Sequence, residues 1–423
     1  MRKRSIRIFC ALALCAAALT PVLGAEEPSK LTEPSTVAWD ELDERVRAGS
    51  FGALAVSEQI QQIESIDYEK MEKNLRDQIN EIAKAQSMLL NGGAVLNQQA
   101  VITQKPAAIL NAAAMQAELT NTMNSLQSAS ETLLPIYQDV RNGKTKRDNA
   151  DTVRLLEDGV SQIVAGSQSL YLSILSLERT YADGTRGVEA IDRSLAELRM
   201  RQQLGQVAKQ TVQGLEQTRN DTVTQLAALE SGIATCKAQL QSLMGEEPTG
   251  ELTLGALPEL EDAAFDAMDH SADLERAKEK SAEMFSAKKA LDDAISERAK
   301  STYAPQTYQY AMAEHALNAA RMTYQSKVQN FETRFQTLCR TIADDRTAAL
   351  NKLEAVSYAE TVFKSEQTRC ERGLISQNKL AEAQDNLTAA LSDLDGARLT
   401  LFQDYHAYQN AVNLGILSQG DAQ

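Results

Sequence analysis

Apolar side chains recur every three or four positions along most of the chain, and Gln, Glu, Lys and Ser fill many of the positions between them. This spacing is typical of amphipathic helices, because one face of a helix returns about every 3.6 residues. The pattern predicts helices over residues 39–90, 106–135, 151–204, 207–244, 260–300, 308–372 and 374–413. Gly49 and Gly52 interrupt the first helix, and Asn91-Gly92-Gly93 is expected to end it.

The two halves of the chain are related in sequence. When they are aligned position by position, Gly205 falls on Gly373 and Val207 falls on Ile375. After each glycine, one position in seven is apolar over five heptads, with Arg219 as the exception. These positions are Val212, Arg219, Leu226, Ile233 and Leu240 in the first half, and Leu380, Leu387, Leu394, Leu401 and Tyr408 in the second. A strict seven-residue repeat predicts helices that wind around each other with a left hand.

A second seam runs beside the first. Its positions are Leu215, Thr222, Leu229, Cys236 and Leu243 in the first half, and Ala383, Ala390, Ala397, Asp404 and Ala411 in the second. Small residues at these positions allow a neighbouring helix to approach closely.

Gly205 and Gly373 each stand where one long helix passes to the next with almost no loop, so we expect an antiparallel hairpin with its tip at each glycine. Long amphipathic hairpins have more apolar seam than one partner helix can cover, which predicts oligomerisation. The predicted fold class is all-α, with long antiparallel coiled-coil hairpins in two structural repeats.

The N-terminus has the pattern of a secretory signal peptide. Basic residues from Arg2 to Arg7 precede an apolar run from Ile8 to Leu19, and small residues follow up to Gly24-Ala25. We interpret residues 1–24 as this signal. An uncleaved membrane anchor is the alternative, although the run is shorter than the ~20 residues that cross a bilayer. Lipidation at Cys15 is a second alternative, although Leu14 is larger than the residue that usually precedes such a cysteine.

The remaining boundaries follow from composition. We predict an extended leader at 25–36, a first hairpin repeat at 37–245 with an extra helical insert at about 91–150, and a linker at 246–258. The second repeat takes 259–415, and a loose tail takes 416–423. After the signal, no segment is expected to be both long and uncharged enough to cross a membrane, so contact with a bilayer would fall to a β-barrel or to partners.

Composition excludes several classes of function. The net charge of -15 argues against a nucleic-acid partner, because phosphate binding needs a basic face. His270, His315 and His406 are far apart, and Cys236, Cys339 and Cys370 have no metal-ligand spacing. The sequence has no glycine-rich phosphate loop, no Gly-x-Ser-x-Gly elbow and no paired-carboxylate pocket. We expect no enzyme activity, no metal and no cofactor.

The segment from Arg372 to Gln384, RGLISQNKLAEAQ, resembles the hairpin-tip signature of the TolC family of outer-membrane efflux proteins. The first half has a weaker counterpart at Leu204–Lys209, and Leu243-Met244-Gly245 resembles the helix end of that family. Val37–Leu42 is similar to the short helix that opens its mature members. The resemblance covers nearly everything after the signal.

The resemblance implies a homotrimer whose hairpins form a hollow helical barrel and conduct substrates across the cell envelope. The hairpin tips would dock onto a periplasmic adaptor protein that links the duct to an inner-membrane pump. By the family pattern, the adaptor-docking residues are Gly205, Gln206, Val207, Ala208, Gly373, Leu374, Ile375 and Ser376. A tight hairpin also needs glycine without any docking, so a purely structural role stays open. The implied location is the outer membrane.

The chain departs from the family pattern in one respect. Family members insert two β-strands into each half, and the breaks at 91–105 and 301–307 are too short for them. We therefore expect little or no β-barrel, and a wall-associated location if it is absent. A non-conducting coiled-coil spacer or interaction scaffold is the alternative function.

Overall fold

The computed structural model describes residues 35–103, 106–300 and 308–417. The chain divides into a unit of residues 1–35 and a unit of residues 36–423, and the second unit is described here. Its elements are β1 (Ser35–Val37), α1 (Trp39–Gly49), α2 (Phe51–Glu64), α3 (Tyr68–Thr103), α4 (Pro106–Arg141), α5 (Lys144–Gln203), α6 (Lys209–Leu243), β2 (Leu252–Leu254), α7 (Asp262–Asp266), α8 (His270–Lys280), α9 (Ala282–Lys300), α10 (Tyr308–Glu371) and α11 (Gln377–Leu414).

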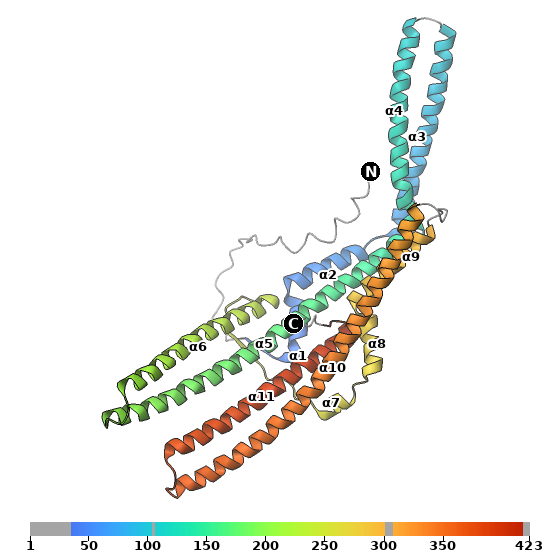
Figure 1. The fold of residues 1–423 in the computed structure, drawn as a ribbon. Coiled ribbons are helices and arrows are strands. Elements are labelled where there is room, and N and C mark those ends of the chain that lie inside the picture. Colours follow the sequence, from blue (N-terminus) through green and yellow to red (C-terminus); the bar gives the residue numbers. More distant parts are fainter. Residues whose placement is uncertain (1–34, 104–105, 301–307, 418–423) are drawn as a thin grey trace. The chain divides into compact units, whose positions relative to one another are not determined.

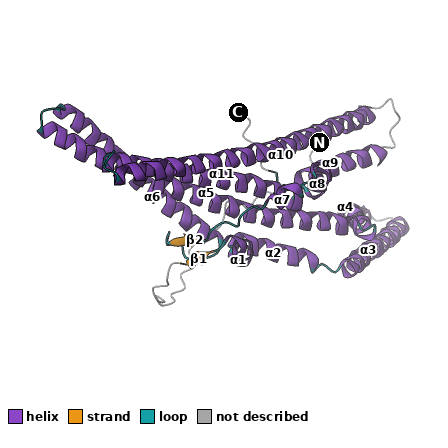
Figure 2. Cartoon of the chain, turned by 90° about the horizontal axis from the view of Figure 1, so that it is seen from below, coloured by secondary structure: helices purple, strands orange, loops and turns teal. Residues whose placement is uncertain are grey.

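The predicted all-α fold of long antiparallel hairpins is confirmed. Helices α5 and α6 pair as one hairpin and α10 and α11 as another, while α3 and α4 form a third (Figure 1). The two three-residue strands pair with each other, as Figure 2 shows beside α1. All five positions of the first heptad seam are buried or half-buried in both α6 and α11, so the repeat in the sequence corresponds to a packed interface.

The structure corrects the predicted stop at Asn91-Gly92-Gly93. Helix α3 continues through these residues and ends at Thr103. A Cβ at Gly93 would lie 3.9 Å from Leu119 Cδ1, so this turn of α3 faces α4. Glycine disfavours a helix by only about 1 kcal/mol, and pairing along the neighbouring helix outweighs that preference. The predicted insert at 91–150 therefore begins inside a helix.

The predicted helix over 260–300 is three helices. Asp269 caps the start of α8, where its carboxylate accepts hydrogen bonds from the backbone N–H groups of Ser271 and Ala272, both at 3.1 Å. Asp273 Oδ2 in turn accepts from the Asp269 N–H at 3.1 Å. This reciprocal pair is a capping box, a helix-start signal that a search for apolar periodicity passes over. Ser281 has extended backbone angles and separates α8 from α9.

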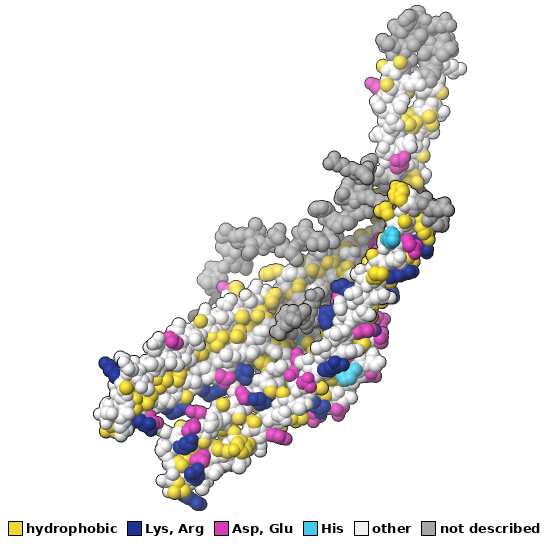
Figure 3. Space-filling view, viewed as in Figure 1, with side chains coloured by type: hydrophobic (Ala, Val, Ile, Leu, Met, Phe, Trp, Pro, Cys, Tyr) yellow, Lys and Arg dark blue, Asp and Glu magenta, His cyan; other side chains and the backbone are white. Residues whose placement is uncertain are grey.

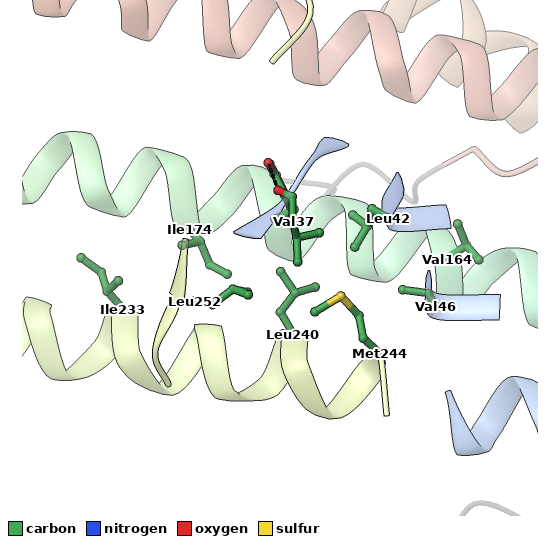
Figure 4. Close-up of a cluster of buried hydrophobic side chains, with 10 residues drawn as sticks. Val37, Leu42, Val46, Val164, Ile174, Ile233, Leu240, Met244 and Leu252 are labelled. Carbon is green, nitrogen blue, oxygen red and sulfur yellow. Dashed lines mark hydrogen bonds between the residues drawn. The ribbon is translucent and has the colours of Figure 1, made fainter. Parts of the chain in front are cut away.

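One cluster of buried side chains supports the first half. It joins α1, α5, α6 and the two strands (Figure 4), through Val37, Leu42, Val46, Val164, Tyr171, Ile174, Ile233, Leu240, Met244 and Leu252. The Tyr171 hydroxyl lies 3.1 Å from the Val37 carbonyl oxygen and 2.9 Å from that of Gly255. Burial raises the pKa of Tyr171 to about 12. This tyrosine fixes the chain entering α1 and the linker to one helix.

A second cluster supports the other half with larger side chains. Its buried members are Ala277, Met284, Phe331, Phe335, Ile342, Leu401, Tyr408, Ala411 and Val412, from α8, α9, α10 and α11. The Tyr408 hydroxyl donates to the Asp273 carboxylate, which is also paired with Arg276. Because buried polar groups need partners, this pair fixes the position of α8 on α11.

The expectation that no later segment could cross a membrane was wrong for α5. By length and composition this helix qualifies, with a window of mean hydropathy 1.2. Residues 159–177 contain no charged side chain. The same stretch supplies Val164, Ala165, Ser167, Tyr171, Leu172 and Ile174 to the interior of the protein. Core helices pass the same test, and packing explains this apolar run.

Several predictions fall beyond the described ranges. The signal peptide, most of the extended leader, the break at 301–307 and most of the tail lie outside the described residues. The segments 94–96 and 100–103, considered above as strands, are helical parts of α3.

Two carboxylates meet in the seam between α10 and α11. Asp404 occupies a position of the second seam where the neighbouring heptads have alanine, and it hydrogen-bonds to Asp345. Asp345 Oδ2 is buried without a partner. Burial, and then the bond to Asp345 and its charge, raise the pKa of Asp404 to about 7.

This pair predicts a pH-dependent stability. Because the pKa of Asp404 in the folded protein lies above its ordinary value, its stabilising contribution is present below pH ~4 and is lost as the pH rises through about 7. We expect the Tm of the purified protein to fall between pH 5 and 8, and Asp404→Asn to flatten that fall. The exposed Asp395→Asn on the same helix is the matched control. Equal slopes in wild type and Asp404→Asn would contradict the assignment.

Candidate docking site at the hairpin tips

The two hairpin tips have the same backbone geometry. At the first tip, the N–H groups of Leu204, Gly205 and Gln206 donate to the carbonyls of Met200, Gln202 and Arg201, at 3.2, 2.9 and 2.9 Å. At the second tip, the N–H groups of Arg372, Gly373 and Leu374 donate to the carbonyls of Thr368, Cys370 and Arg369, at 3.2, 2.8 and 2.9 Å. Each bond in one half has its counterpart at the aligned position of the other half.

A left-handed glycine ends the first helix of each hairpin. Gly205 has φ +72° and Gly373 has φ +70°. A Cβ at either position would meet nothing within 4 Å, so space does not require glycine there. The backbone conformation does, because residues with a Cβ lose about 1–2 kcal/mol in this region.

The tips differ where the second helix begins. Ser376 caps α11, and its hydroxyl accepts a hydrogen bond from the Lys379 N–H at 3.3 Å. Ala208 holds the matching position before α6 and offers no side-chain acceptor. The first tip therefore leaves a backbone donor for water that the second tip satisfies internally.

Most of the predicted docking residues are on the surface. Six of the eight are exposed, while Val207 and Ile375 are half-buried, in matching positions. Leu374 is 65% exposed. The structure adds two exposed apolar side chains at the first tip that the family pattern did not indicate, Met200 at 64% and Leu204 at 68%. Their signal in the sequence is an apolar residue next to the turn, outside the heptad seam.

Charged pairs surround the first tip. Arg199 pairs with Glu216 at 2.7 Å and Arg201 pairs with Glu197 at 2.5 Å. Further along the hairpin, Arg219 binds Asp192 at 2.5 Å, replacing an apolar seam residue with an ion pair. Hydrogen bonding to Arg219 lowers the pKa of Asp192, and both groups are exposed.

Polar contacts join the two hairpins along α5 and α11. Arg193 pairs with Asp385, and the Asn378 side-chain amide donates to Glu197 Oε2 at 3.2 Å. Further from the tips, the Ser392 hydroxyl donates to Asp183 Oδ1 at 2.6 Å. A cavity of about 260 Å³ lies among these groups. The contacts fix the spacing of the two tips within one chain.

Arg179 ends this series. Its Nη1 donates to the Ser392 carbonyl at 2.8 Å, and its Nε is buried without a partner. Gly396 provides the room for this side chain, because a Cβ there would lie 2.3 Å from Arg179 Nη1. Glycine in α11 is thus required by a side chain from the other hairpin.

Other features lie elsewhere. The largest cavity among the described residues, about 660 Å³, is lined by the linker, α5, α10 and α11, including Leu257, Phe265, Arg346 and Phe402. Within the described ranges, no group of three or more His, Cys, Asp and Glu side chains could hold a metal ion.

No family model matches the chain, and no curated protein matches it. Solved structures do. The outer membrane protein VceC of Vibrio cholerae is 15% identical over 64% of this chain and 75% of its own, with a TM-score of 0.37. The outer-membrane channel OprN is 12% identical over 65% of this chain and 73% of its own, with a TM-score of 0.47. For CusC, whose structures concern transmembrane channel formation, the values are 12%, 81%, 97% and 0.45.

This chain is therefore similar in fold to outer-membrane efflux channels of the TolC kind. Likenesses of this distance do not extend to what the chain conducts or binds. Those questions rest on its own residues.

The tip glycines can be tested by substitution. We expect Gly205→Ala or Gly373→Ala to destabilise the protein by about 1–2 kcal/mol, because alanine strains the left-handed turn. Gly214→Ala in α6 is the control, because its site is open and helical, and it should stabilise by up to about 1 kcal/mol. The free energy of unfolding in urea measures each change. Equal effects at the tips and at Gly214 would refute the geometry.

The contact between the hairpins has its own test. Gly396→Ala should destabilise the protein by about 1–3 kcal/mol, because Arg179 must give up its bond to the Ser392 carbonyl. In an Arg179→Ala background the same change should be neutral or stabilising, as for any Gly→Ala in a helix. A double-mutant cycle in urea gives the coupling. Additive effects would show that the two residues do not meet.

Proposed function

We propose that this protein is the subunit of an export duct that conducts substrates across the cell envelope. The supporting observation is the pair of tips with the same three backbone hydrogen bonds, carried by two hairpins in one chain. Two equivalent docking elements per subunit suit a ring in which every hairpin presents the same end to a partner.

The proposed assembly is a homotrimer, following the resemblance of the RGLISQNKL segment to TolC-family tips. Its tips dock onto a periplasmic adaptor, which connects the duct to an inner-membrane pump. The exposed apolar residues Met200, Leu204 and Leu374 add contact area beside the turns, and aliphatic side chains of this kind bury favourably at an interface.

The proposed location is the cell envelope, reached through the predicted signal peptide at 1–24, with the outer membrane as the family's site. In this proposal the protein carries out no chemistry on its substrates. Selection of the substrate then belongs to the pump, because a wide conduit offers few specific contacts.

The first test is the assembly itself. Light scattering on the purified mature protein should give three times the mass of one chain, and electron-microscope images should show an axial lumen. A monomer or a dimer without a lumen would overturn the duct and support the scaffold. Gly214→Ala serves as a control for normal assembly, because it lies outside both tips.

A further inference from the structure

Charge is distributed unevenly along hairpin α3–α4. The first part of α3, residues 68–84, has eight charged side chains among seventeen residues. The stretch that follows, residues 85–117, contains one, Lys105, whereas the whole chain is 24% charged. The change occurs within a helix, so it does not mark a boundary between elements.

Another hairpin in the same chain provides the comparison. Residues 188–219 form the end of hairpin α5–α6, and this stretch of similar length has nine charged side chains. Figure 3 shows dark blue and magenta side chains over the hairpins α5–α6 and α10–α11, and mostly yellow and white on the described surface of α3 and α4. A hairpin surrounded by water normally carries charge on its outer faces, as α5–α6 does.

Large apolar side chains occupy the outer face of this uncharged stretch. Ile82, Leu89 and Gly93 are half-buried, and Gly93 faces Leu119 of α4, so they form the inner seam. Met88, Leu90 and Val95 lie off that seam and are 60%, 65% and 54% exposed. Met115 of α4 is 49% exposed. Pairing between the two helices therefore leaves these side chains uncovered.

We propose that the distal part of hairpin α3–α4, residues 86–103 and 106–117, is a surface that inserts among the uncharged acyl chains of a lipid bilayer. Charge is missing from every face of both helices, and hydrocarbon is the environment that excludes it on every side. A protein partner covering one face would leave the opposite face in water. The uncharged part of α3 is roughly 27 Å long at about 1.5 Å per residue, close to the ~30 Å of a hydrocarbon core.

The insertion is that of a paired hairpin. Among the described residues, only α5 combines the length and hydropathy of an independent spanning helix. Amides such as Asn91 and Gln98 lower the hydropathy of α3. Backbone polar groups in both helices are satisfied internally, which hydrocarbon requires. With a chain charge of -15 and a single lysine in the stretch, anionic head groups do not supply the attraction.

Site-directed fluorescence tests this surface in the full mature protein. Cys236, Cys339 and Cys370 are replaced by serine, and single cysteines at Met88, Val95 or Met115 carry an environment-sensitive dye. With neutral phosphatidylcholine vesicles, we expect a blue shift and quenching by brominated acyl chains at all three positions. The exposed Gln78→Cys, in the charged part of α3, is the matched control and should show neither.

Vesicle flotation gives a second readout that does not depend on the dye. The double variant Leu90→Lys with Val95→Lys should bind vesicles at least about tenfold more weakly, because each charge opposes insertion. Gln78→Lys should bind as wild type does. Binding should not change between about 0.1 and 0.5 M NaCl, since attraction to acyl chains is not screened.

Two results would overturn the proposal. Labels that stay open to iodide with and without vesicles would show that the surface remains in water. Shifts that follow protein concentration and need no vesicles would show that a second copy covers it. Either result leaves the trimer test unaffected, because that test measures mass and lumen in solution.

Discussion

Apolar seams one or two residues wide hold this protein together. Each long helix buries one row of side chains against its neighbour, and large interior clusters occur only where α1, the strands or α8 add further layers. Seams of this kind depend on register, because a shift of one residue turns the row out of the interface. The left-handed glycines, the helix caps and the contacts between hairpins all act by holding that register.

The two halves solve this problem with different side chains. The first half places Tyr171 across the strands and the linker, whereas the second places Tyr408 against Asp273 of α8. At the second seam, the first half has Leu and Cys where the second has alanines and Asp404. Hairpin α10–α11 is thus packed through smaller residues and includes a titrating carboxylate pair. The backbone of the tips stayed the same while the packing behind them changed.

Much of the fold could be predicted from the sequence, because heptad spacing and left-handed glycines are local signals. The seam from Val212 to Leu240 and the turns at Gly205 and Gly373 needed no tertiary information. Asn91-Gly92-Gly93 misled the prediction, since the helix there depends on contact with α4. The break at Asp269 was missed although its capping box is visible in the sequence. Arg179 and Gly396 could not be paired in advance, because they lie in different hairpins and share no motif.

The two tips share a backbone but not a cap, and this makes them unequal in their dynamics. Ser376 supplies a hydroxyl to the first turn of α11, while Ala208 leaves the first turn of α6 to the solvent. Amide hydrogens at the start of α6 should exchange faster than those at the start of α11. In any ring built from this chain, tightly and loosely wound tips would then alternate around the axis. Such a ring has two kinds of contact point, one already ordered and one that orders when it is bound.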